Sequence, residues 1–276
     1  MIGNDLRHSD ARQANLGSPA GTGADRVLAC LQLLAGYSDG ASLDEISKAL
    51  RSPKSSTHRA LASLMRARLV EQDEERRYRL SLHWIRLALS FYDGLDKPRL
   101  VQPVLNELAQ MFGETAHYAE LDDLEIVYLG QARAPGERVQ MTARIGARLP
   151  AYCTSLGKAM LAHLLHDGDA VTHFLELYGP LAKRTPQTLT SADALGGELR
   201  ATRERGYAVD REESDVGITC VAFPIFLGGS KPTGAISVSA LASRTPLAVL
   251  IEKADEIKHV IGAHLGEAAL QVPGSV

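Results

Sequence analysis

Between residues 24 and 80, the spacing of apolar positions predicts three short helices followed by a hairpin. Apolar side chains recur at helical intervals from Ala24 until a glycine-containing segment interrupts them, which predicts the first helix. The second helix should begin after Ser42, because Glu45 follows three residues later and the two side chains can cap each other's backbone amides.

A third helix is predicted almost directly after the second. The connection Arg51-Ser52 is short, so we expect Ser52 to cap the new helix and Pro53 to occupy its first position. At helical spacing, one face of this helix is largely apolar and holds Thr57, Ala60, Leu61, Leu64 and Met65. The opposite face is polar and basic, and it holds Lys54, Ser55, His58, Arg59, Ala62 and Arg66. Such a pair of helices is typical of a helix-turn-helix whose second helix enters the major groove of DNA.

The tract between Val70 and Leu80 predicts a β-hairpin wing whose arginines reach DNA phosphates. We expect the lysine and arginine side chains to contact phosphates, and the serines and histidine of the third helix to contact base edges or sugars. The predicted DNA-contacting residues are Lys54, Ser55, Ser56, His58, Arg59, Arg76 and Arg77.

Positive charge is concentrated in this part of the chain. From Arg51 to Arg68 there are five lysines and arginines and no acidic residue, although the formal net charge of the chain is -3. The alternative is a solvated basic helix in an ordinary helical bundle, because charged runs usually form wet faces. The capping signals, the tight turn and the wing occur together here. This combination favours a protein that binds a double-stranded DNA operator.

A helix with two apolar stripes is predicted from Ser81 to about residue 97. One stripe contains Leu82, Ile85 and Leu89, and the other contains Trp84 and Ala88. A helix that is apolar on two sides needs burial on two sides. We interpret it as a linker that also pairs with a second copy of the chain; burial inside one domain is the alternative.

The remainder of the chain mixes helices with strands that pair as hairpins. Helices are predicted at residues 101–112, 154–165, 169–178, 192–205 and 246–269. Strands are predicted at residues 114–121, 124–130, 138–145, 207–210, 217–226 and 233–241. Because strands and helices do not alternate regularly, the fold class should be α+β, with an antiparallel sheet covered by helices.

Length and composition favour two domains in a soluble, cytoplasmic protein. The 276 residues are 45% hydrophobic, without an apolar run of membrane-spanning length or a signal-peptide pattern. The predicted divisions are a disordered tail (1–23), a winged helix-turn-helix (24–80), a linker and dimerisation helix (81–97) and a second domain (98–276). Three widely spaced cysteines predict neither a disulfide framework nor a zinc site, and no cofactor or metal is expected.

Four motifs, in order and at characteristic spacing, resemble the IclR family of bacterial transcriptional regulators. They are RSPKSSTHR (51–59), PAYCTSLGKA (150–159), RGYAVD (205–210) and GAISVS (234–239). The resemblance implies a GAF-like effector domain behind the winged helix-turn-helix, a homodimer or homotetramer, and a small organic-acid effector. It also implies that the effector contacts Ser155, Leu156, Asp210, Cys220, Ser237 and Ser239.

The residues themselves are compatible with a pocket at these positions. Ser155 and Leu156 lie in the first turn of a predicted helix, where backbone amides lack intrahelical partners. Ser237 and Ser239 alternate with apolar residues, so their hydroxyls share one face of a strand. That face could instead be wet, and the bulk of Leu156 could narrow a pocket.

Several of these residues have purely structural interpretations. Cys153 and Cys220 could be core residues, Gly157 could serve close packing, and Lys158 could face solvent. A different function class, a cysteine-dependent hydrolase, would pair Cys153 or Cys220 with His117 or His163 and with Asp210. No nucleophile elbow, metal-ligand cluster or phosphate loop accompanies these residues, so a regulator is the favoured function.

Overall fold

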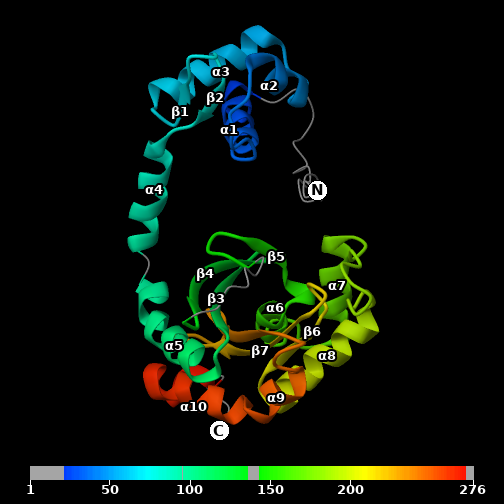
Figure 1. Cartoon of the computed structure of the whole chain (residues 1–276). Helices are drawn as coiled ribbons and strands as arrows, with labels where there is room; N and C mark the ends of the chain where they lie inside the picture. Colours follow the sequence, from blue (N-terminus) through cyan, green and yellow to red (C-terminus); the bar gives the residue numbers. More distant parts are fainter. Residues whose placement is uncertain (1–21, 95, 136–142, 272–276) are drawn as a thin grey trace, which may run out of the picture. The chain divides into compact units, whose positions relative to one another are not determined.

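The structure is a computed structural model that describes residues 22–94, 96–135 and 143–271 (Figure 1). The chain divides into two compact units between Leu95 and Asp96. The predicted disordered tail lies outside the described residues, except that Thr22 and Gly23 belong to the first helix.

The N-terminal unit contains the three helices, the hairpin and the linker helix expected from the sequence. The helices are α1 (Gly23–Leu34), α2 (Leu43–Ala49), α3 (Lys54–Arg66) and α4 (Leu82–Asp93), and the hairpin is β1 (Val70–Gln72) with β2 (Tyr78–Leu80). The predicted capping box at the start of α2 is confirmed, because the Ser42 amide donates to Glu45 Oε2 at 2.7 Å and the Glu45 amide donates to Ser42 Oγ at 3.3 Å.

Two details predicted for α3 are wrong. The helix is capped by Pro53 without a side-chain hydrogen bond, and within the described residues the buried Ser52 Oγ has no hydrogen-bond partner. The Ser52 amide donates to Ser47 O at 3.0 Å while Arg51 adopts a positive φ of 47°, so the connection closes onto α2 rather than capping α3. Met65 is also exposed, although the other four residues of the predicted apolar face are buried.

The C-terminal unit is built on a six-stranded antiparallel sheet. Its strands are β3 (Thr115–Asp122), β4 (Glu125–Arg133), β5 (Arg148–Pro150), β6 (Ala208–Arg211), β7 (Ile218–Ile225) and β8 (Gly234–Leu241). They are arranged in the order β5-β4-β3-β8-β7-β6. The predicted hairpins are present: β3 pairs with β4 and β7 pairs with β8.

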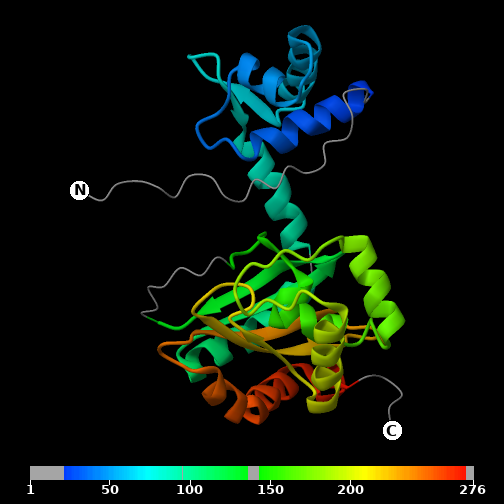
Figure 2. The same cartoon turned by 90° about the vertical axis from the view of Figure 1, so that its right-hand side faces the viewer.

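Helices cover both faces of this sheet (Figure 2). The face that carries Val221 and Val238 packs on α5 (Asp96–Phe112), α9 (Leu247–Glu252) and α10 (Ala254–Leu265). The face that carries Ala222 packs on α6 (Ser155–Leu161), with α7 (Gly168–Tyr178) and α8 (Ala192–Arg205) beyond it. The α+β class and the helix-covered antiparallel sheet are therefore confirmed.

Several predicted boundaries shift. Residues 138–142 of one predicted strand lie outside the described residues, and residues 143–147 form a turn before β5. The helix expected to run to residue 165 ends at Leu161. The predicted C-terminal helix is interrupted at Lys253, with α10 followed by a short 3-10 helix (Glu267–Leu270). Helix α5 begins before Pro98, which it accommodates in its first turn because the amide there needs no intrahelical acceptor.

A backbone contact at Gly157 sets how closely α6 approaches the preceding 3-10 helix (Ala151–Cys153). A Cβ atom at Gly157 would lie 2.2 Å from Ala151 O and 2.4 Å from Ala151 Cα, and neither atom is a movable side-chain end. The close-packing interpretation of Gly157 is therefore correct.

We expect Gly157→Ala to lower the free energy of unfolding of the C-terminal unit by about 1–3 kcal/mol, because the added methyl group overpacks this contact. The matched control is Gly197→Ala in α8, where nothing lies within 4 Å of the added Cβ. It should stabilise the protein by about 0.5–1 kcal/mol through helix propensity. Urea unfolding followed by far-ultraviolet circular dichroism compares the two, and equal effects would show that the Gly157 contact is not limiting.

Candidate functional site

The exposed face of α3 carries most of the predicted DNA-contacting residues. Lys54, Ser55, His58 and Arg59 are exposed, whereas Ser56 is half-buried and its hydroxyl lies 3.5 Å from an Arg59 guanidinium nitrogen. Lys54 also pairs with Asp44 of α2 at 2.7 Å. Such an exposed pair contributes little to stability, so the lysine can exchange this partner for a phosphate.

The two wing arginines differ in their surroundings. Arg76 lies at the exposed turn of the hairpin with a φ of 60°. The Arg77 guanidinium instead donates to Gly40 O at 2.7 Å and to Asp39 O at 3.2 Å, and it lies 3.5 Å from a Glu45 carboxylate oxygen. The expected DNA contact of Arg77 stays a prediction, and the structure adds a structural role, because its donors hold the wing against the α1–α2 loop.

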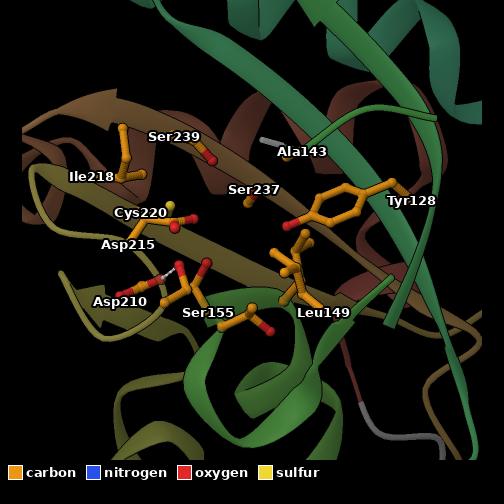
Figure 3. A pocket seen from close by; sticks show the side chains of 13 residues that line it. Tyr128, Ala143, Leu149, Ser155, Asp210, Asp215, Ile218, Cys220, Ser237 and Ser239 are labelled. Carbon is orange, nitrogen blue, oxygen red and sulfur yellow. Dashed lines mark hydrogen bonds between the residues drawn. The ribbon is translucent and has the colours of Figure 1, made fainter. Parts of the chain in front are cut away.

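A second candidate site is a cavity in the C-terminal unit, between α6 and the sheet (Figure 3). About 380 Å³ of space free of protein atoms lies between its lining residues, and part of this space is open to solvent. All six residues that the family resemblance implied line it: Ser155, Leu156, Asp210, Cys220, Ser237 and Ser239. The other lining residues are Tyr128, Ala143, Leu149, Thr154, Ser214, Asp215 and Ile218.

Strand register brings the polar lining residues together. Asp210 on β6 is opposite Cys220 on β7, which in turn is opposite Ser239 on β8. Paired residues share a face of the sheet, and Ser237 is two positions from Ser239, so all four point to the α6 side. Ser237 Oγ is fully buried and has no hydrogen-bond partner within the described residues, which leaves a donor available to a ligand.

Sequence reasoning did not identify Tyr128, whose ring extends from β4 into the cavity (Figure 3). Its spacing of two residues from Ile126 is typical of one face of a strand, but this pattern does not show that the face lines a cavity. Ser214 and Asp215 were also missed, because they belong to a loop without a periodic pattern.

Asp210 is the buried carboxylate of the cavity wall. Its two oxygens accept hydrogen bonds from the Glu213 amide at 2.7 Å and from Ser214 Oγ at 2.9 Å. Burial raises the pKa of Asp210 to about 7, although Lys158 and these hydrogen bonds favour the charged form.

Behind this wall, Lys158 of α6 forms a buried ion pair with Glu213. The lysine is fully buried, which corrects the alternative that it faces solvent. The backbone of the same loop is also held from the other side: Thr188 Oγ1 donates to Glu213 O at 2.7 Å, and Arg184 Nε donates to Ser214 O at 3.1 Å. The loop that presents Asp210 and Ser214 is therefore fixed by several independent contacts.

His117 orients one of the serines. Its Nδ1 lies 3.3 Å from Ser239 Oγ and its Nε2 lies 3.0 Å from the Gln131 side-chain amide nitrogen. The amide nitrogen can only donate, so we assign the imidazole proton to Nδ1, which donates to Ser239 Oγ. The Ser239 hydroxyl can then donate to its cross-strand neighbour Cys220. Burial lowers the pKa of His117 to about 4, so the ring is neutral.

The arrangement of the cysteines does not support a thiol nucleophile. Burial raises the pKa of Cys153 to about 12 and also raises the pKa of Cys220, so both thiols remain protonated. In the described parts of the chain, no hydrogen bond joins either cysteine to His117 or His163.

None of the helices in the described parts of the chain has the length and apolar character needed to cross a membrane.

Two family profiles match the chain. The one described as "Bacterial transcriptional regulator IclR C-terminal" matches residues 93–260, and the one described as "IclR helix-turn-helix domain" matches residues 23–74. The chain belongs to the IclR family of transcriptional regulators. This result confirms the resemblance carried by the four sequence motifs, and it agrees with the helix-turn-helix and the effector-type domain seen in the structure.

Named relatives cover most of the chain. The HTH-type transcriptional regulator XynR of Escherichia coli (strain K12) is 32% identical over 235 residues, which are 85% of this chain and 92% of XynR. The transcriptional repressor IclR of the same organism is 33% identical over 222 residues, which are 79% of this chain and 80% of the relative.

Solved structures share the fold. A putative transcriptional regulator from Rhodococcus has a TM-score of 0.75 at 25% identity, covering 90% of this chain and 97% of that one. An IclR homolog from Microbacterium hydrocarbonoxydans, complexed with 4-hydroxybenzoate, has a TM-score of 0.67 at 24% identity, covering 88% of this chain and 100% of that one.

We expect Arg76→Ala and Arg77→Ala to have different effects. Arg77→Ala removes hydrogen bonds from a charged donor to two backbone carbonyls and should destabilise the N-terminal unit by about 1.5–3 kcal/mol. Arg76→Ala should leave stability unchanged and reduce the salt dependence of DNA binding by about one phosphate contact. Thermal unfolding monitored by Trp84 fluorescence, together with DNA titrations at several salt concentrations, distinguishes them. A loss of salt dependence in Arg77→Ala at unchanged stability would contradict the structural role.

We expect Lys158→Met to lower the free energy of unfolding by about 3–5 kcal/mol, because it leaves the Glu213 carboxylate buried without a counter-charge. The double variant Lys158→Met with Glu213→Gln should recover much of this loss. Lys253→Met is the matched control, since Lys253 forms an exposed pair with Glu256 and should cost less than about 1 kcal/mol. Urea unfolding measures all three, and equal losses in the single and double variants would contradict the ion-pair interpretation.

Proposed function

We propose that this member of the IclR family binds an operator through α3 and the wing, and that a small organic acid bound in the cavity controls its operator affinity. The observation that carries the proposal is the convergence of Ser155, Leu156, Asp210, Cys220, Ser237 and Ser239 on one buried cavity. These residues come from four elements, α6, β6, β7 and β8, so their meeting depends on the fold.

DNA recognition is assigned to the exposed face of α3 and to the tip of the wing. Lys54, Arg59 and Arg76 are placed to neutralise phosphates, and Ser55, Ser56 and His58 are the candidates for contact with base edges or sugars. Arg77 supports this surface indirectly, because it positions the hairpin.

The effector is assigned to the cavity because its polar groups point inward and are incompletely satisfied. Ser237 and Ser239 offer hydroxyl donors, and the first-turn amides of Ser155 and Leu156 lack intrahelical acceptors. The Leu156 side chain is buried at the cavity and limits its size. The IclR homolog of similar fold that was solved in complex with 4-hydroxybenzoate supports a small organic acid as the ligand.

We further propose that the protein acts as a homodimer or homotetramer. Helix α4 leaves several large apolar side chains exposed, namely Leu82, Trp84, Ile85, Leu87 and Leu89. Contiguous exposed apolar residues on one helix indicate an interaction surface. Two copies related by a two-fold axis would present paired recognition helices to half-sites about 34 Å apart or a multiple of that spacing.

The double variant Ser237→Ala/Ser239→Ala tests the effector site. It should retain operator affinity and lose most of its response to an organic acid, because two donors of the cavity are removed while the N-terminal unit is unchanged. Mobility-shift assays with the promoter fragment, titrated with 4-hydroxybenzoate and other small carboxylates, measure both properties. Ser230→Ala, at an exposed serine in the loop between β7 and β8, is the control for a neutral serine replacement. A double variant that responds like the parent would exclude these serines from the site.

A further inference from the structure

The wall of the cavity contains acidic groups and no basic side chain. Asp210 and Asp215 both line it, whereas none of its lining residues in the described parts of the chain is a lysine or arginine. An anionic ligand in this cavity therefore meets a second negative charge unless one of the carboxylates is neutral. The protonation states of the groups around Asp210 decide which carboxylate becomes neutral.

Polar and titratable groups from several elements contact Asp210 or interact with it electrostatically. These groups are Lys158 and Ser155 from α6, Cys220 from β7, Tyr128 from β4, Cys153 from the 3-10 helix, and Glu213, Ser214 and Asp215 from the following loop. Burial raises the pKa of the tyrosine and of both thiols, so these three groups are neutral. The remaining charges are the Lys158 ammonium, the carboxylates of Asp210, Glu213 and Asp215, and the Arg184 guanidinium beside Asp215. Helix α8, which packs against β6, adds the Glu198 carboxylate, and this carboxylate is paired with Arg205 and Arg211.

The available cations are already committed. The Lys158 ammonium contacts Glu213 directly, and Arg184 lies 3.9 Å from Asp215. Among the described residues, Asp210 accepts hydrogen bonds from one amide and one hydroxyl, and it is 1% exposed. Each of its oxygens uses one lone pair for these bonds and keeps another that can take a proton. Burial already raises the pKa of this carboxyl to about 7 before any ligand is bound.

We propose that an anionic effector enters this cavity together with one proton, which resides on the Asp210 carboxyl and is donated as a hydrogen bond to the effector. The inference rests on the proposed function and adds a regulatory property to the same site. The proton comes from solvent, no other bond changes, and the pair of carboxylates shares it as closely placed carboxylates do.

The sign of the pH dependence follows from this assignment. The complex holds the proton more tightly than the free protein, so affinity is highest below the pKa of Asp210 in the free protein. Above about pH 7, affinity should fall roughly tenfold per pH unit, until the pH reaches the pKa of Asp210 in the complex. The regulator would then respond to the same effector concentration more strongly in acidic than in alkaline conditions.

Isothermal titration calorimetry of the full chain tests the inference with acetate, propionate, butyrate and benzoate. These acids are largely ionised above about pH 6, so a proton that the ligand itself took up would be counted at about pH 6 as well as at about pH 8, whereas uptake by Asp210 disappears where this residue is already protonated. Binding enthalpies in two buffers of different ionisation enthalpy, both of which buffer at the pH of the experiment, give the number of protons taken up per ligand. We expect a value near one at about pH 8 and near zero at about pH 6.

Two variants assign the proton to a residue. Asp210→Asn carries a permanent donor in place of the protonated acid. It should bind the probes with an affinity that does not change between about pH 6 and 8.5 and that matches the parent at about pH 6. Asp215→Asn, the other acidic wall residue, should keep the tenfold fall per pH unit. The buffer comparison in the parent protein requires no variant, so it remains decisive if Asp210→Asn fails to fold.

The outcomes separate this inference from the proposed function. Binding of a probe without proton uptake, or an unchanged pH slope in Asp210→Asn, would overturn the proton linkage and leave the effector site in place. A ligand hydroxyl that donates to an ionised Asp210 would give this result. Failure of all four acids to bind at about pH 6 would remove the organic-acid effector and the linkage together.

Discussion

The buried ion pair between Lys158 and Glu213 is the interaction on which the cavity depends. It joins α6 to the loop after β6, and both partners are almost completely excluded from solvent. Desolvating two charges is expensive, so the pair is stable only while both partners are present in the correct geometry. That requirement holds Glu213 and its neighbour Ser214 in place, and their backbone and side-chain donors in turn orient the carboxylate of Asp210.

The same loop carries backbone strain that the surrounding contacts compensate. Glu212 adopts a positive φ of 60°, and its carboxylate accepts a hydrogen bond from the Gly217 amide at 2.7 Å. The hydroxyl of Thr185 donates to Glu212 O at 2.6 Å. Strained residues persist where the neighbouring structure over-determines them, and such positions are common at binding sites. The loop behind the cavity wall is therefore held by several hydrogen bonds, and such pre-organisation lowers the entropic cost of binding.

The two faces of the central sheet have different consequences for function. One face meets α5, α9 and α10 through Val221, Val238 and other large apolar residues, and it forms a closely packed core. The other face combines small residues such as Ala222 with the serines, the cysteine and the aspartate of the cavity. Small side chains leave space beneath α6, and the polar ones supply hydrogen bonds within it. A ligand there is desolvated, so an unpaired donor or acceptor would be costly and would discriminate between related acids.

Local sequence signals determined most of the fold and the family. Three of these signals are the capping box at Ser42, the helical period of α3, and the alternation of Ser237 and Ser239 with apolar residues. Each depends on neighbours a few residues away, so it can be recognised without the tertiary structure. Only tertiary packing decided the roles of the charged residues. Arg77 is a basic residue of the predicted wing, but its guanidinium donates to backbone carbonyl oxygens 37 and 38 positions earlier in the chain. Lys158 forms its ion pair with a carboxylate 55 positions later. Periodicity does not encode which distant groups meet, because strand register and the burial of each charge set those contacts.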